Sequence, residues 1–306
     1  MSGIEQLQSR LANVRTVEPI LGALRTISLG SWQAAQNQRT GLQRFAYHLQ
    51  EVLRQVAPAL PQPSPRRLWS RAKPVPAVVP DNPERVVLLV LGTERGLCGR
   101  FNDAIVERAL DYMEARAAEE VSVTLAVLGS RAGRLFKRAG QPFSVAGALS
   151  TTALPSFALA FALMQGWLAE YEAATLDAVD LVYNAYAGVG RYTTTVQRLL
   201  PPEAPSVDAD VPEAVGYRPP TIVETDPVRL YARVVEQWAA LSFYGLLLDG
   251  AAAEHATRYQ LMEAASQNAE RLIEELTLEM QSLRRQAITR EMQELAVGAG
   301  LMSPRD

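Results

Sequence analysis

The residues best suited to chemistry lie in one short segment, residues 93–102. It follows an apolar run at residues 85–92 and precedes a helical pattern that starts near Asn102. A loop between a strand and a helix can present backbone amides to a phosphate. Only Gly96 and Gly99 supply glycine here, and neither a G-x-G-x-x-G nor a G-x-x-x-x-G-K-[ST] pattern occurs in the chain. The segment is therefore interpreted as a tight turn that needs the backbone freedom of glycine.

The same segment holds the one cysteine of the chain, Cys98. A thiol near a helix N-terminus can act as a nucleophile, because its pKa falls there. The two histidines, His48 and His255, lie far away in the sequence on predicted helices, without a ligand pattern. We therefore expect a buried or half-buried thiol, no Cys/His zinc site and no nucleophile elbow. No catalytic, cofactor-binding or metal-binding residue is predicted.

Strands and helices alternate in the middle of the chain. The runs at 85–92 and 121–128 are β-branched and aliphatic, and similar runs occur at 178–183 and 192–199. Helical patterns cover about 102–118 and 157–171, and another helix is expected after Gly129. This alternation predicts a Rossmann-like α/β domain with a largely parallel sheet.

Both ends of the chain show helical periodicity. Near the N-terminus, apolar residues recur at three- and four-residue steps: Leu7, Leu11, Val14, Val17, Leu21, Leu24 and Ile27. Residues 255–297 contain neither proline nor glycine and keep heptad-like apolar spacing. Some seventy helical residues, at about 1.5 Å each, would reach roughly 105 Å. We expect two long helices that form an antiparallel coiled coil, with a separate helical bundle as the alternative.

Proline content divides the chain into five predicted parts. These are an N-terminal helix at 1–60, a proline-rich linker at 61–84, the α/β domain at 85–201, a connector at 202–225 and a C-terminal helix at 226–306. Near the C-terminus, residues 283–291 mix charged with small side chains, and residues 296–302 are small and apolar. That end is either an ordinary solvated helix or a narrow tip suited to a tight sleeve.

Composition excludes several classes of function. The net charge of -3 shows no basic excess, so nucleic acid is not expected as a partner. The first ten residues lack the layout of a signal peptide, and no apolar run approaches the roughly twenty residues that cross a bilayer. Membrane contact is therefore expected only through other proteins.

Four segments together resemble the gamma subunit of F-type ATP synthases, as a divergent member. Residues 8–14 resemble the family's first helix, the sequence RGLCG at 95–99 resembles its most recognisable loop, and residues 181–184 and 199–201 match its closing strands. The matches to its last helix are Arg258, Met262, Ala264, Ala265, Asn268, Leu272, Ile273, Leu276, Arg284, Ile288, Thr289, Glu291 and Glu294, followed by residues 298–299.

The resemblance implies a non-catalytic rotor subunit. The terminal helices would form a central stalk inside a ring of alternating alpha and beta subunits, which hold the nucleotides. The α/β domain would meet the epsilon subunit and the membrane c-ring at the cytoplasmic face of the membrane. Proton or sodium flow would turn this stalk, and the catalytic sites of the ring would change their affinities in response.

The resemblance also implies which residues contact the ring. Arg258, Arg284, Arg285, Thr289 and Glu291 are the predicted contacts, with Arg285 in place of the family's glutamine. Basic residues typical of the family are replaced elsewhere, by Pro19, Gly22, Ser31 and Glu263. Such losses weaken electrostatic complementarity to acidic loops of the beta subunits. Two alternatives stay open on these residues: a gamma-like paralogue of a variant rotary ATPase with altered coupling, and a nucleotide-binding α/β enzyme.

Overall fold

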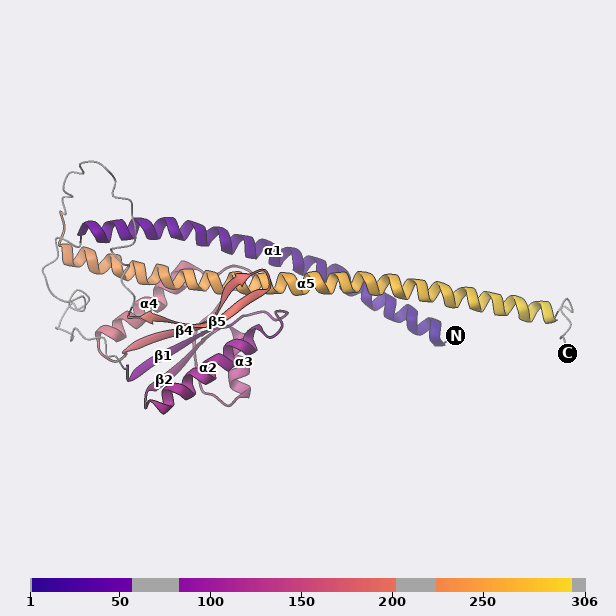
Figure 1. Cartoon of the computed structure of the whole chain (residues 1–306), viewed down its shortest axis with the longest axis horizontal. Helices are drawn as coiled ribbons and strands as arrows, with labels where there is room; N and C mark the ends of the chain where they lie inside the picture. Colours follow the sequence, from indigo (N-terminus) through magenta and orange to yellow (C-terminus); the bar gives the residue numbers. More distant parts are fainter. Residues whose placement is uncertain (1, 57–82, 202–223, 299–306) are drawn as a thin grey trace. The chain divides into compact units, whose positions relative to one another are not determined.

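The computed structural model describes residues 2–56, 83–201 and 224–298 (Figure 1). The chain divides into two compact units, one formed by Leu29–Arg258 and one by Met1–Ser28 with Tyr259–Asp306. Most of the predicted linker 61–84 and connector 202–225 lies outside the described residues, as do residues 299–306. The five-part division stays a prediction.

The Leu29–Arg258 unit contains a five-stranded sheet. Its strands are β1 (Arg85–Leu91), β2 (Ser122–Leu128), β3 (Ser144–Gly147), β4 (Ala178–Gly188) and β5 (Arg191–Leu200), in the order β3-β2-β1-β4-β5. All neighbours are parallel except β4 and β5, which form an antiparallel hairpin. The prediction of a largely parallel sheet is confirmed. Sequence patterns missed β3, because it is only four residues long and lies at the sheet edge.

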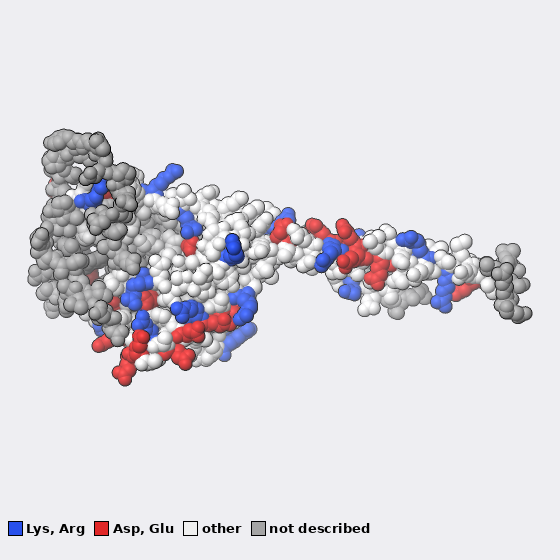
Figure 2. All heavy atoms as spheres, in the orientation of Figure 1, with Lys and Arg blue, Asp and Glu red and all other residues white. Residues whose placement is uncertain are grey.

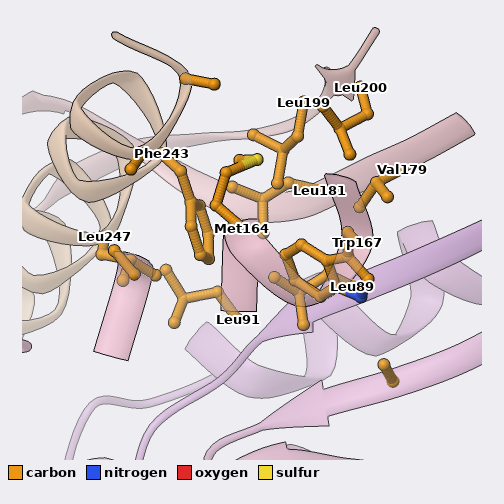
Figure 3. Close-up of a cluster of buried hydrophobic side chains, with 14 of the residues drawn as sticks. Leu89, Leu91, Met164, Trp167, Val179, Leu181, Leu199, Leu200, Phe243 and Leu247 are labelled. Atoms are coloured by element: carbon orange, nitrogen blue, oxygen red, sulfur yellow. The ribbon is translucent and has the colours of Figure 1, made fainter. Parts of the chain in front are cut away.

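Alternate residues of β1 supply two separate cores. Leu88 and Val90 pack on one face with residues of α2 (Phe101–Ala118) and α3 (Ser130–Arg138). Leu89 and Leu91 pack on the other face with α4 (Phe157–Glu172) and with part of the C-terminal helix (Figure 3). Successive side chains of a strand point to opposite faces, so a continuous apolar run is what a strand covered on both faces needs.

Two long helices form the ends of the chain, α1 (Ser2–Val56) and α5 (Pro227–Gly298). In the Leu29–Arg258 unit, Leu49 and Leu53 of α1 cluster with Val234, Val235 and Leu241 of α5. An ion pair of 2.8 Å joins Arg39 to Asp249 in the same unit. Because lower numbers in α1 meet higher numbers in α5, the two segments run antiparallel.

The second unit repeats this arrangement with other residues. Leu7 and Leu11 of α1 cluster with Leu276 of α5, and Arg25 forms a 2.9 Å ion pair with Glu263. Here too the segments run antiparallel, which confirms the predicted coiled coil. Within the described parts of the chain, no helix combines the length and apolar character needed to cross a membrane.

Candidate functional site

The turn that follows β1, residues 93–100, begins in close contact with the turn that follows β2. A Cβ on Gly92 would lie 2.4 Å from the Cβ of Ala132, and one on Gly129 would lie 2.5 Å from the carbonyl carbon of Gly92. Gly129 has a φ of 99° and Gly99 a φ of 60°, values that favour glycine. Leu97 also has a positive φ, 64°, and its side chain is 58% exposed. We call residues 93–100 the carboxyl-edge turn.

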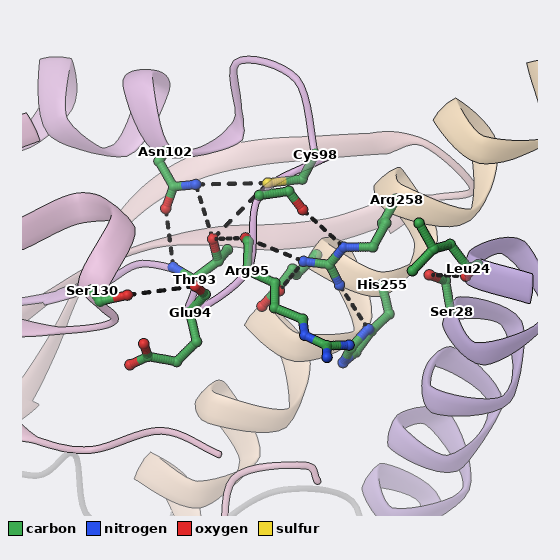
Figure 4. A network of polar contacts seen from close by, with 12 residues as sticks. Leu24, Ser28, Thr93, Glu94, Arg95, Cys98, Asn102, Ser130, His255 and Arg258 are labelled. Atoms are coloured by element: carbon green, nitrogen blue, oxygen red, sulfur yellow. Dashed lines mark hydrogen bonds and ion pairs between the residues drawn. The ribbon is translucent and has the colours of Figure 1, made fainter. Parts of the chain in front are cut away.

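Buried polar side chains hold this turn from the side of α2 (Figure 4). The side-chain oxygen of Asn102 accepts a hydrogen bond from the amide of Thr93 at 3.0 Å, and its side-chain nitrogen donates to Thr93 Oγ1 at 3.0 Å. That nitrogen also lies 3.6 Å from the sulfur of Cys98. Thr93 Oγ1 in turn donates to the carbonyl of Arg95 at 2.7 Å. The side-chain amide of Asn102 and the hydroxyl of Thr93 thus fix the conformation of the turn.

Arg258 of α5 holds the same turn from the opposite side (Figure 4). Its guanidinium donates to the carbonyl of Gly96 at 3.1 Å and contacts that of Arg95 at 3.4 Å. It also pairs with Glu254 and lies 3.1 Å from Nδ1 of His255. We call Arg258, Glu254, His255 and these two carbonyls the Arg258 cluster. Arg258 is only 5% exposed, so its contacts in this structure lie within its own chain.

Burial shapes the protonation states in the Arg258 cluster. Burial and, to a smaller extent, the charge of Arg258 together lower the pKa of His255 to about 4, so the ring is neutral at pH 7 and can accept a hydrogen bond. Burial raises the pKa of Glu254, and the charge and hydrogen bond of Arg258 oppose that rise. The neutral ring and the carboxylate together offer acceptors to the arginine.

The hairpin of β4 and β5 contributes a third support, Asn184. Its side-chain nitrogen donates to the carbonyl of Phe101 at 2.9 Å, and its oxygen accepts from Thr194 Oγ1 at 2.7 Å. Asn184 is almost fully buried. Sequence reasoning gave Glu254 and Asn184 no side-chain role, because they lie in an ordinary helical and an ordinary strand pattern. It placed Thr93 in the turn without assigning a role to its hydroxyl.

The hydrogen bonds described above occupy the polar groups in and around the turn. Burial raises the pKa of the Cys98 thiol, which keeps it protonated at neutral pH. Its hydrogen-bonding neighbours, Thr93 and Asn102, cannot act as a base at that pH. Among the residues that the structure describes, no cluster of three or more His, Cys, Asp or Glu side chains could hold a metal ion.

The other predicted contact residues lie on the last turns of α5. Arg284, Arg285, Thr289 and Glu291 are all exposed, and Thr289 Oγ1 donates to the carbonyl of Arg285 at 2.9 Å. Ile288, Met292 and Leu295 are exposed at four- and three-residue steps, so they form one apolar stripe. We call residues 284–298 the exposed end of α5. Charged side chains alternate with uncharged surface toward the C-terminal end of α5 in Figure 2.

The chain matches known proteins along nearly its whole length. The family model described as ATP synthase covers residues 3–301. A protein from Sorangium cellulosum named ATP synthase gamma chain is 29% identical over 98% of each chain. A protein of the same name from Rubrobacter xylanophilus is 28% identical, again over 98% of each chain.

Solved structures share the fold. A chain in the Euglena gracilis mitochondrial ATP synthase (OSCP/F1/c-ring) gives a TM-score of 0.59 at 14% identity, covering 100% of this chain and 98% of that one. A chain in the Tetrahymena thermophila mitochondrial ATP synthase central stalk and c-ring gives 0.51 at 20% identity, covering 81% and 99%. Since the family model spans almost the entire sequence, this chain belongs to the ATP synthase family, in which its relatives are gamma chains.

Proposed function

We propose that this chain is the gamma subunit of an F-type ATP synthase and forms the central stalk of its rotor. The observation that carries the proposal is the match to gamma chains over 98% of the sequence. The antiparallel pairing of α1 with α5 in both units supports it, because a stalk that transmits torque must resist twisting along its length.

Its role is to transmit rotation between a membrane c-ring and a catalytic ring of alpha and beta subunits, with the epsilon subunit bound to the α/β domain. Chains of similar fold occur in complexes that contain a c-ring and F1. Proton or sodium flow would turn the stalk, and the ring would answer with changes in nucleotide affinity. This is coupling between distant sites through a mechanical element.

The chain itself would carry out no chemical step. The carboxyl-edge turn holds a protonated thiol, and its amide and hydroxyl groups are used to fix the turn. The nucleotide-binding enzyme considered from the sequence lacks the glycine pattern of a phosphate loop. Isothermal calorimetry of the isolated chain with ATP should show no binding, and micromolar affinity would revive the enzyme interpretation.

We propose that the exposed end of α5 contacts the ring through Arg284, Arg285, Thr289 and Glu291. The exposure of these side chains, together with the apolar stripe beside them, fits a helix that is covered by partner subunits. A ring contact of Arg258 would require its guanidinium to leave the Arg258 cluster, and it stays a prediction. We place the complex at the cytoplasmic face of a membrane, with this chain bound to it peripherally.

A gamma-like subunit with altered coupling remains the second candidate, because Glu263 stands where the family often has a lysine. The structure gives this carboxylate a partner in the same unit, Arg25, at 2.9 Å. Both side chains are about one-third exposed, so the pair contributes little to stability. An acidic group neutralised within the coiled coil would not repel acidic loops of the beta subunits strongly, which favours a working stalk.

Affinity purification of the tagged chain from its native membranes tests the assignment. Mass spectrometry should recover alpha, beta, epsilon and c subunits in the proportions of one complex. A quadruple variant, Arg284→Ala, Arg285→Ala, Thr289→Ala and Glu291→Ala, should recover fewer alpha and beta subunits and as many epsilon subunits. Recovery of the chain with unrelated proteins only would refute the rotor assignment.

A further inference from the structure

The segment of α5 that packs on the sheet carries several small side chains. Residues 250–253 are Gly-Ala-Ala-Ala, and Ala256 follows, all without long side chains. A Cβ on Gly250 would lie 2.7 Å from Leu91 Cδ2, and Ala253 is fully buried in the core shared with α2 and α3. Apolar contact between small groups favours close approach but is non-directional, so it resists rotation of a helix about its own axis only weakly.

Polar contacts flank this segment of small residues on both sides. Before it, Asp249 Oδ2 accepts a hydrogen bond from the amide of Tyr186 at 3.1 Å, and Asp249 pairs with Arg39. After it, Arg258 binds the carbonyl of Gly96 in the carboxyl-edge turn, 162 residues away in the sequence. Hydrogen bonds are directional, so these two contacts fix the angle at which α5 lies on the sheet.

Of these two contacts, the one made by Arg258 involves more hydrogen-bond acceptors. A buried guanidinium meets one carboxylate, two carbonyls and a neutral imidazole, so several of its five N–H donors have an acceptor. Lysine would place a single ammonium where a planar fork now reaches acceptors on two segments of chain. The turn that it holds is also fixed by Asn102 and, through Phe101, by Asn184.

We propose that Arg258 is a positioning residue that locks the carboxyl-edge turn onto α5, so that torque passes between α5 and the α/β domain without slippage. The role in torque transmission rests on the proposed rotor function, whereas the contact by which Arg258 holds the turn rests on the structure alone. The two parts can therefore be tested separately.

The lock is tested in the free full-length chain with Cys98 as the reporter. Cys98 is the one cysteine of the chain, is 2% exposed and lies inside the turn that Arg258 holds. Its reaction with a disulfide reagent such as DTNB therefore requires the turn to open. In Arg258→Gln we expect the labelling rate to rise about tenfold or more, since one partner of a buried charge pair is lost.

Matched variants separate local opening from unfolding. Arg229→Gln removes an exposed arginine from the same helix and the same unit, and should leave the labelling rate unchanged. Arg258→Lys keeps the charge and should give an intermediate rate, which also serves if Arg258→Gln does not fold. Circular dichroism must show intact secondary structure at the labelling temperature. Labelling rates of Arg258→Gln and Arg258→Lys equal to that of the unmodified chain would overturn the lock.

The torque part is tested in the complete ATP synthase complex, reconstituted in sealed vesicles. Rates of ATP hydrolysis and of ATP-driven ion pumping are measured side by side. In Arg258→Gln, hydrolysis should persist while the ratio of pumping to hydrolysis falls, and Arg258→Lys should restore part of the ratio. A faster-reacting thiol with an unchanged ratio would overturn the torque role. Failure of the unmodified chain to assemble would refute the proposed function and leave the thiol result standing.

Discussion

The carboxyl-edge turn and the exposed end of α5 are both polar, and they use polarity in opposite ways. In and around the turn, Thr93, Asn102 and Arg258 are buried, and every contact described above joins groups of the same chain. At the end of α5, Arg284, Arg285 and Glu291 point to solvent, beside an apolar stripe. Residue type alone therefore does not distinguish a polar side chain that holds the fold from one that lies on an exposed surface. Four predictions test this difference.

The largest expected effect comes from removing a buried carboxylate, with an exposed carboxylate at the end of α5 as its control. Asp180 of β4 is buried and accepts hydrogen bonds from the Tyr112 hydroxyl and the Arg198 guanidinium. Asp180→Ala leaves the partly buried guanidinium of Arg198 and the buried hydroxyl of Tyr112 without their acceptor, so we expect a loss of about 3–5 kcal/mol in the free energy of unfolding. Glu291→Ala should change it by less than ~0.5 kcal/mol. Urea unfolding followed by tryptophan fluorescence measures both, and similar losses would contradict the comparison.

The coiled coil offers a matched pair two residues apart. Leu276 is 4% exposed and packs with Leu7 and Leu11, whereas Leu278 on the same helix is 63% exposed. Leu276→Ala should cost about 2–5 kcal/mol, because it removes buried methyl groups and leaves a cavity. Leu278→Ala should cost less than ~0.5 kcal/mol. Thermal melting followed by circular dichroism at 222 nm compares them; equal shifts would mean that α1 and α5 do not pack as described.

A pH dependence should distinguish the Arg258 cluster from the exposed end of α5. The folded pKa of His255, about 4, lies below its ordinary value of 6.5. Protonation therefore favours the unfolded chain, so its contribution is fully present above pH 6.5 and is lost as the pH falls toward 4. The resulting loss in the free energy of unfolding should reach about 3 kcal/mol. Because Glu254 titrates in both proteins, the histidine is isolated as the difference between the unmodified chain and His255→Asn. A difference that does not vary with pH would show that the ring is not buried as described.

The smallest effect is expected from exchanging two serines, one that caps a helix and one on an exposed helix face. Ser156 caps α4, since its hydroxyl accepts a hydrogen bond from the amide of Leu159 at 3.3 Å. Ser156→Ala should cost about 1 kcal/mol. Ser282→Ala, on an exposed turn of α5, should be neutral or stabilise by up to ~0.5 kcal/mol, because alanine is the better helix former. Denaturant midpoints at constant m-value report both changes.

Much of the fold could be predicted from local patterns. The runs at 85–92 and 121–128 became β1 and β2, and the helical pattern at 102–118 became α2. The antiparallel pairing of the terminal helices followed from two apolar stripes that need a partner. Such features depend on periods of two and 3.6 residues, which any short window of sequence displays. The edge strand β3 was missed because four residues without an alternating pattern give no such signal.

The candidate site was predicted only in part. Residues 93–102 were correctly interpreted as a tight turn, and Cys98 as a buried thiol. Asn184 was not recognised, because its partners lie on α2 and β5. Glu254 was not recognised either, although its partner Arg258 lies four residues further along the same helix. The predicted ring contacts at Arg284, Arg285, Thr289 and Glu291 are exposed, and what covers them stays a prediction.

By itself the sequence determined the secondary structure, the need for glycine in the turn, the two apolar stripes and the family, because these depend on neighbours along the chain. The tertiary structure alone decided which way each charge faces. Arg258 and Arg284 lie on one helix, yet one is buried against Gly96 and the other faces solvent. Burial of a charge depends on acceptors supplied from far along the chain, and no local pattern carries that information.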